Sequence, residues 1–267
     1  NMIVVLQRDD IDIAGNAGQA AQSVQINAAT HAYLGSEQDI NIDRVGAGQA
    51  IRIKGGGGIY EYALRNTNQA AISGDSLILE ASTGAVGRDG RPLTVDIANA
   101  LTVRAGTEIW LRGMAGSQNV TGGLNLQEIF AHGDITLDSD GSIADARGGS
   151  RLVALQSLNG AVNLSADGDI GADGNPLRLS AAGAVSADAG GDVHLGAVAT
   201  VPAPNLRTDL RIGHIDAGGD VSVSAEQGNL TVDGAIRSAG TLALKADGTL
   251  SQAAADFTAP GNITVEA

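Results

Sequence analysis

The side chains able to do chemistry are few and widely separated in this sequence. Its 267 residues include no Cys, which excludes disulfide frameworks, thiolate zinc sites and Cys nucleophiles. The four His residues form neither a His-x-His nor a His-x-x-x-His pair, and no calcium-binding nonapeptide or EF-hand loop is present. These His residues are His31, His132, His194 and His214. We therefore expect no metal ion and no cofactor.

Catalytic motifs are also missing. No Gly-x-Ser-x-Gly elbow occurs, and the run Gly55-Gly56-Gly57-Gly58 lacks the Lys and Ser/Thr of a phosphate-binding loop. A β-helical polysaccharide lyase or glycosidase is the strongest enzymatic alternative. Such an enzyme needs paired carboxylates, or calcium with a basic residue, in a cleft that usually carries aromatic rings. Two Lys and one Trp provide little material for this, so we expect no catalytic residues and no enzyme.

The most conspicuous candidate for ligand contact is Trp110. In the segment 108–112, alternation directs Ile109 and Leu111 inward, and Trp110 and Arg112 outward. An outward Trp beside an Arg resembles a binding hot spot. The alternative is a Trp that is covered by the neighbouring segment 113–123.

Two tyrosines form a second candidate contact surface. Tyr60 and Tyr62 share one face of a strand with Leu64, and this face either binds a ligand or packs in the core. Phe130 and Phe257 are expected to pack within the protein.

Short alternating segments must position these residues. Apolar residues recur at every second place in segments such as 39–43, 134–138 and 241–244, with Gly, Asp or Asn between them. Such alternation over four to six residues predicts half-buried strands joined by tight turns. No long segment has helical spacing, so the sequence predicts an all-β protein.

The spacing of these strands indicates a solenoid. Val221, Leu242 and Ile263 begin equivalent segments at a constant offset of 21. A constant period near 20 that contains short strands and turns is typical of one coil of a right-handed parallel β-helix. Small and branched side chains suit this fold, because its core is thin.

A longer internal repeat accompanies the short one. Residues 86–93 recur as residues 170–177, an offset of 84. Over 86–111 the offset gives 10 identities in 26 positions without a gap. Since 84 is four times 21, we expect the two copies to lie four coils apart, with Trp110 equivalent to His194.

The regularity differs along the chain. Residues 76–267 form the regular repetitive part, whereas 1–75 form a less regular β region that we expect to belong to the same solenoid. Segments 113–123 and 197–208 lack alternation and are predicted to be exposed loops.

Composition excludes several classes of partner. The formal net charge of −14 disfavours binding to nucleic acid and to anionic membrane surfaces. No stretch approaches 18 consecutive apolar residues, so we expect no transmembrane segment.

Several predicted strands resemble repeats of the filamentous haemagglutinin-like exoproteins of bacterial two-partner secretion, which are large adhesins. These strands include 133–137, 228–232 and 239–244. The resemblance covers about 76–267, and the secretion-domain motif Asn-Pro-Asn-Leu is absent, so the chain resembles an internal or distal segment. It implies secretion through an outer-membrane transporter partner and folding at the bacterial cell surface. It also implies adhesion to a host or bacterial receptor or to polysaccharide. A pure structural spacer is the remaining alternative.

Overall fold

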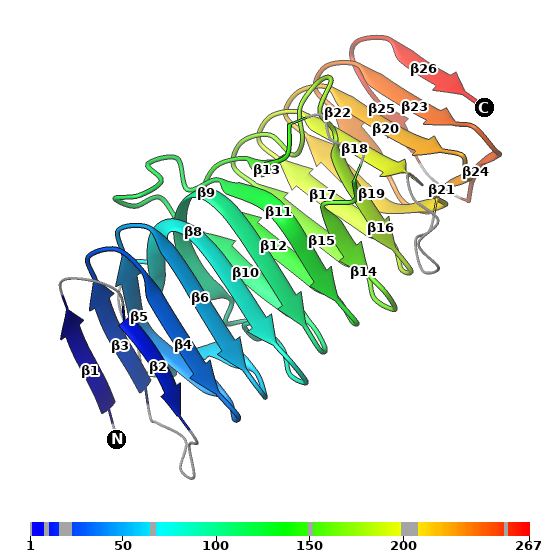
Figure 1. The fold of residues 1–267 in the computed structure, drawn as a ribbon. Helices are drawn as coiled ribbons and strands as arrows, with labels where there is room; N and C mark the ends of the chain where they lie inside the picture. The colour runs from blue at the N-terminus through cyan, green and yellow to red at the C-terminus, as the bar shows by residue number, and fades with distance from the viewer. Residues whose placement is uncertain are drawn as a thin grey trace.

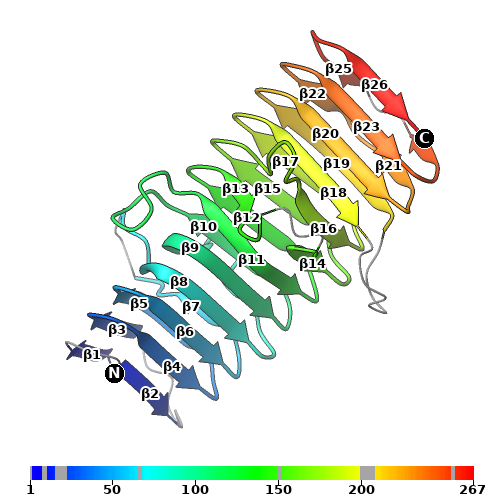
Figure 2. The ribbon, with the colours of Figure 1, turned by 45° about the horizontal axis from the view of Figure 1, so that its top comes forward.

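A computed structural model gives the arrangement of the chain. It describes residues 2–7, 11–15, 23–64, 68–148, 152–198, 208–253 and 256–267. These residues form strands, turns and loops without any helix, so none of them lies in a helix that could cross a membrane. Figures 1 and 2 show the strands of successive turns side by side along one axis, with the two termini at opposite ends. The protein is a parallel β-solenoid of about ten turns.

Each turn consists of two passes of the chain, and the parallel pairings join these passes into two walls. Wall A contains β1 (Met2–Gln7), β3 (Ser23–Ala28), β5 (Ile40–Ala47), β7 (Ile59–Glu61), β10 (Ile109–Gly113), β12 (Ile135–Ser139), β15 (Val162–Ala166), β17 (Val185–Ala189), β19 (Leu210–Ala217), β21 (Leu230–Val232), β22 (Ile236–Ser238), β24 (Leu250–Gln252) and β25 (Phe257–Thr258).

Wall B contains β2 (Ile11–Gly15), β4 (Ala32–Ser36), β6 (Ala50–Gly55), β11 (Leu124–Ala131), β13 (Ile143–Asp145), β14 (Leu155–Ser157), β16 (Leu177–Ala181), β18 (Val193–Val198), β20 (Val221–Glu226), β23 (Leu242–Ala246) and β26 (Ile263–Glu266). The long strands β8 (Ile72–Ala81) and β9 (Leu93–Ala105) begin in wall A and end in wall B.

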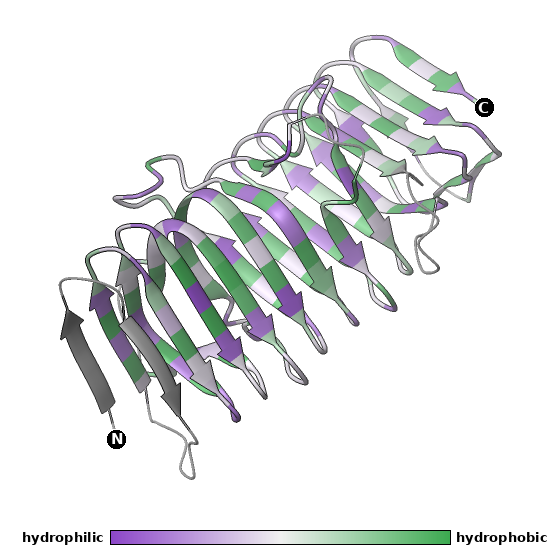
Figure 3. Cartoon of the chain, viewed as in Figure 1, coloured by the Kyte–Doolittle hydropathy of each residue, from purple (hydrophilic) through white to green (hydrophobic). Residues whose placement is uncertain are grey.

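Apolar side chains from both walls form one core. Equivalent residues of successive turns stack in columns, one of which runs through nine turns of wall B. Its members are Ile53, Leu79, Val103, Ile129, Leu155, Leu179, Ala197, Ala225 and Ala246, all of them buried. Figure 3 shows the alternation that produces this arrangement, with hydrophobic and hydrophilic positions following one another along the strands. Alternation therefore separates the core from two outer surfaces.

The turn length varies along the solenoid. Val221 pairs with Leu242, and Leu242 pairs with Ile263, so the last turns have the length that the sequence predicted. The spacing over the whole solenoid is roughly 23 residues. The additional residues lie in longer connections such as 114–123, which contains no strand and confirms the predicted loop. The other predicted loop, 197–208, falls mostly outside the described residues.

The long repeat is structural, but its copies do not lie four coils apart. Val86 bridges Ile59 and Ile109 in wall A, whereas Ile170 bridges Ile143 and Val193 in wall B. Seven passes separate the two copies, so the offset of 84 corresponds to three and a half turns. The expectation was wrong because it applied the short period of the last turns to every turn, whereas the turns between the copies are longer.

Each copy of the repeat interrupts a strand with a small hairpin. Arg88 and Arg91 exchange backbone hydrogen bonds of 3.0 and 2.9 Å, and Ala172 and Asn175 exchange bonds of 3.1 and 3.0 Å. We call residues 87–92 hairpin 1 and residues 171–176 hairpin 2. Hairpin 1 is an excursion from wall A, and hairpin 2 is an excursion from wall B.

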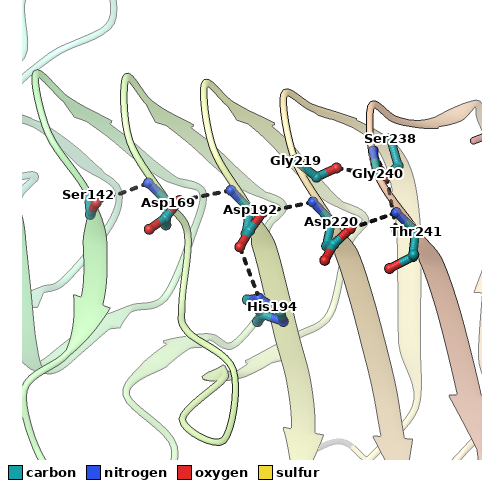
Figure 4. A network of polar contacts seen from close by, with 9 residues as sticks. All are labelled: Ser142, Asp169, Asp192, His194, Gly219, Asp220, Ser238, Gly240 and Thr241. Carbon is teal, nitrogen blue, oxygen red and sulfur yellow. Dashed lines mark hydrogen bonds and ion pairs between the residues drawn. The ribbon is translucent and has the colours of Figure 1, made fainter. Parts of the chain in front are cut away.

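Polar side chains join successive turns at the edge that leads from wall A to wall B. The carboxylate of Asp169 accepts a hydrogen bond of 2.8 Å from the backbone N–H of Asp192, whose carboxylate accepts one of 2.7 Å from the N–H of Asp220. Asp220 in turn accepts a bond of 2.6 Å from the N–H of Thr241 (Figure 4). At the opposite edge Asp209 and Asn229 accept equivalent bonds from the turns that follow them. The side-chain oxygens of these turn residues thus satisfy backbone donors between the strands.

Candidate functional site

The outer surface of wall A carries the residues that were predicted to contact a ligand. Ile109 and Leu111 are fully buried, and Trp110 between them faces outward and is partly exposed, as alternation predicts. Tyr60, Gly87 and Trp110 occupy adjacent positions in three successive turns, since each follows a member of the Ile59–Val86–Ile109 ladder. The structure therefore places Tyr60 and Trp110 on the same face, separated by the first residue of hairpin 1.

Arg112 has two partners on the next turn of the solenoid. Its Nη2 lies 2.9 Å from an oxygen of Asp140, and its Nε lies 3.5 Å from an oxygen of Asp138. The hydrogen bond to Asp140 raises the pKa of Arg112, and the charge of Asp138 adds to this effect. A ligand at Trp110 would therefore have to compete with Asp138 and Asp140 for the guanidinium of Arg112.

Hairpin 1 holds the tyrosine segment in place. The guanidinium of Arg88 lies 3.9 Å from the ring centroid of Tyr60, a cation–π contact. Arg91 donates hydrogen bonds of 2.7 Å and 2.6 Å to the carbonyls of Tyr62 and Ala63. Strand β7 ends before Tyr62, and both tyrosines are only partly buried, so neither is a core residue. Leu64 is 80% exposed, which contradicts the core alternative for that side chain.

A second surface, on wall B, was missed from the sequence. Phe130 was expected to pack internally, but Ile129 and Ala131 occupy the core and Phe130 faces outward. Its ring meets that of His132 edge to face, with 5.4 Å between the centroids. We call the outer face of wall B around this residue the Phe130 surface.

Two hollows adjoin the ring of Phe130. One, of about 210 Å³, is lined by Lys54, Glu80, Arg104 and His132. The other, of about 360 Å³, is lined by Glu128, Arg147, Leu152 and Gln156 among others. Phe130 lines both hollows, so it lies between them. Shallow hollows beside a partly exposed ring suit contact with an extended ligand better than enclosure of a small one.

The described residues contain no group of three or more His, Asp or Glu side chains that could hold a metal ion. The chain matches no protein-family model, no curated protein and no solved structure.

Proposed function

We propose that this chain is a segment of a bacterial surface adhesin of the filamentous haemagglutinin-like kind, which acts by reach and contact rather than by catalysis. The observation that carries the proposal is the continuous solenoid, whose ten or so turns present two outer walls with separate contact residues. At about 4.8 Å per turn, such a rod is about 50 Å long. Secretion through an outer-membrane transporter belongs to the same proposal.

The contact residues support a binding role for the outer faces. Partly exposed aromatic side chains bind partners with little loss of conformational entropy, and they are enriched in binding hot spots. Trp110 and Tyr60 lie on wall A, and Phe130 lies on wall B. A spacer without any ligand would not need aromatic rings on its surface.

The test is an adhesion assay with the chain immobilised on beads. We expect these beads to bind bacterial or epithelial cells, or surfaces coated with polysaccharide, above the level of uncoated beads. Trp110→Ala is compared with Asn163→Ala, a change at an exposed position of the same outer ladder two turns away. Adhesion weakened only by Trp110→Ala places a contact at wall A, whereas equal adhesion removes Trp110 from the site. Absence of adhesion by the wild-type chain to all of these surfaces refutes the proposal and favours a spacer.

A further inference from the structure

The outer face of wall B carries cations and apolar side chains in register along the solenoid axis. One ladder places Tyr33, Arg52, Ile78 and Thr102 at equivalent positions of four successive turns. The neighbouring ladder runs through Lys54, Glu80, Arg104, Phe130 and Gln156. From Tyr33 to Gln156 the face spans five turn spacings, or about 24 Å at 4.8 Å per turn.

The charge of this face contrasts with that of the whole molecule. The chain has a net charge of −14, yet these two ladders contain the three cations Arg52, Lys54 and Arg104. They are opposed by two carboxylates within the same ladders, Glu80 and Glu128, of which Glu128 continues the first ladder after Thr102. The face therefore carries a small positive excess in an acidic protein. An anionic ligand would be repelled elsewhere and attracted here.

The ion pairs of this face are open to exchange. Lys54 Nζ lies 3.7 Å from Glu80, and Arg104 Nη2 lies 2.8 Å from Glu128, with the basic side chains 60% and 56% exposed. Exposed pairs of this kind contribute little to stability. The cations can therefore turn toward a ligand at small cost, and several of them can act together along one chain.

Apolar surface lies between the charges. Tyr33 is 38% exposed and stacks on His31 with 6.0 Å between the ring centroids, and Ile78 is 41% exposed. Phe130 lies between the two hollows. Rings and aliphatic groups of this kind pack against the C–H faces of sugar rings, whereas the cations pair with carboxylates or sulfates.

We propose that the Phe130 surface binds an anionic linear polysaccharide that lies along the solenoid axis. Arg52, Lys54 and Arg104 pair with its anionic groups, and Phe130 packs against a sugar ring. The anionic groups are uronate carboxylates or sulfate esters. This proposal rests on the proposed adhesive function and names the ligand class of one face.

The experiment compares binding of polygalacturonate, dextran sulfate, neutral dextran and a single-stranded oligonucleotide by the wild-type chain and by three variants. Lys54→Gln and Phe130→Ala change the proposed surface. Lys245→Gln is a matched control, because Lys245 is 61% exposed, lies on wall B and pairs with Glu266 at 4.0 Å, but stands near the other end of the solenoid. Thermal unfolding of every variant tests whether each is folded.

We expect binding of one or both anionic polymers, stronger than that of neutral dextran and weaker at high salt. Lys54→Gln should weaken it roughly three- to tenfold, as should Phe130→Ala, whereas Lys245→Gln should have no effect. The polymer that binds identifies carboxylate or sulfate as the recognised group.

Three results would overturn this ligand assignment. They are equal losses for Lys54→Gln and Lys245→Gln, binding of a single-stranded oligonucleotide as tight as that of the polysaccharides, and binding of neither anionic polymer. If the chain on beads still adheres to cells in any of these cases, the adhesive function stands and only the ligand class is wrong.

Discussion

The two hairpins allow a direct test of how tightly successive turns are packed. Gly87 and Gly90 of hairpin 1 have φ values of +73° and +66°, both in the left-handed region. A Cβ at Gly87 would lie 2.0 Å from the carbonyl oxygen of Trp110, whereas a Cβ at Gly90 would meet no atom of the described residues within 4 Å. Replacement by Ala thus imposes the same backbone strain at both positions and a steric clash at only one.

The expected magnitudes follow from these contacts. Gly90→Ala should lower the free energy of unfolding by about 1–2 kcal/mol, the usual penalty for a left-handed Ala. Gly87→Ala must in addition displace the neighbouring backbone. The hydrogen bonds from Gly87 N to Ile59 O (2.8 Å) and from Trp110 N to Val86 O (2.7 Å) would be strained or lost. At about 1 kcal/mol each, they bring the total for Gly87→Ala to about 3–4 kcal/mol.

Hairpin 2 provides a replicate in the same molecule. Gly171 has φ +73°, and a Cβ added there would lie 2.2 Å from the carbonyl oxygen of His194, whereas a Cβ at Gly174 (φ +71°) would meet none of the described atoms within 4 Å. Unfolding in urea is followed by circular dichroism. The midpoint urea concentration should be well below that of Gly90→Ala for Gly87→Ala, and well below that of Gly174→Ala for Gly171→Ala. Equal midpoints within both pairs would mean that strain alone matters and that the turns do not pack as described.

Two further predictions concern charged groups. Arg178 is 8% exposed, and its Nε and Nη1 have no hydrogen-bond partner among the residues that the structure describes. Arg178→Met should therefore raise the free energy of unfolding by about 1 kcal/mol or more, whereas Arg237→Met on the exposed face of β22 should change it by less than about 0.5 kcal/mol; a loss of stability in Arg178→Met would contradict a cost of burying these two nitrogens. Hydrogen bonds from the Thr241 backbone and hydroxyl lower the pKa of Asp220 from 3.8, so the ionised carboxylate stabilises the fold above pH 3.8 and this effect is lost as the pH falls through the lower folded-state pKa. The loss of thermal stability between about pH 5 and about pH 2 should therefore be smaller in Asp220→Asn than in the wild type, and an equal loss in the two proteins would contradict this role of Asp220.

Alternation and spacing were sufficient to predict the type of fold. Ile109 and Leu111 are buried and Trp110 faces outward because a strand has a period of two, whatever the rest of the fold. The strand that begins at Val221 pairs in register with the one that begins at Leu242, as its spacing indicated. These properties are local or strictly periodic, so the residue order determines them.

The Phe130 surface could not be assembled from the sequence in the same way. Alternation does place Phe130 outward, because Ile129 and Ala131 take the core positions. However, three of its neighbours, Lys54, Glu80 and Arg104, come from earlier turns. Which residues pair between turns depends on the length of each turn, and these lengths differ. The residue order gives no means of locating the inserted residues within each turn.

The burial of outward-facing residues beneath a loop could likewise not be predicted from the sequence. Asp96 belongs to the outer face of β9 by alternation, yet it is 4% exposed. Its carboxylate accepts hydrogen bonds of 2.7 Å and 3.1 Å from the N–H groups of Asn119 and Gln118 in the loop 114–123. A tertiary contact therefore overrides the pattern here, and the loop is anchored to the wall that it follows.

The half-turn in the long repeat has a physical meaning. The offset of 84 maps β7 onto β13, β9 onto β16 and β17, and β10 onto β18, which exchanges wall A and wall B at every step. Such an exchange preserves the core only if both walls require the same alternation of apolar residues. This condition is met, because each wall presents buried columns to the same thin core. The repeat can therefore begin at either wall, and it places equivalent hairpins, with Trp110 beside one and His194 beside the other, on opposite outer surfaces.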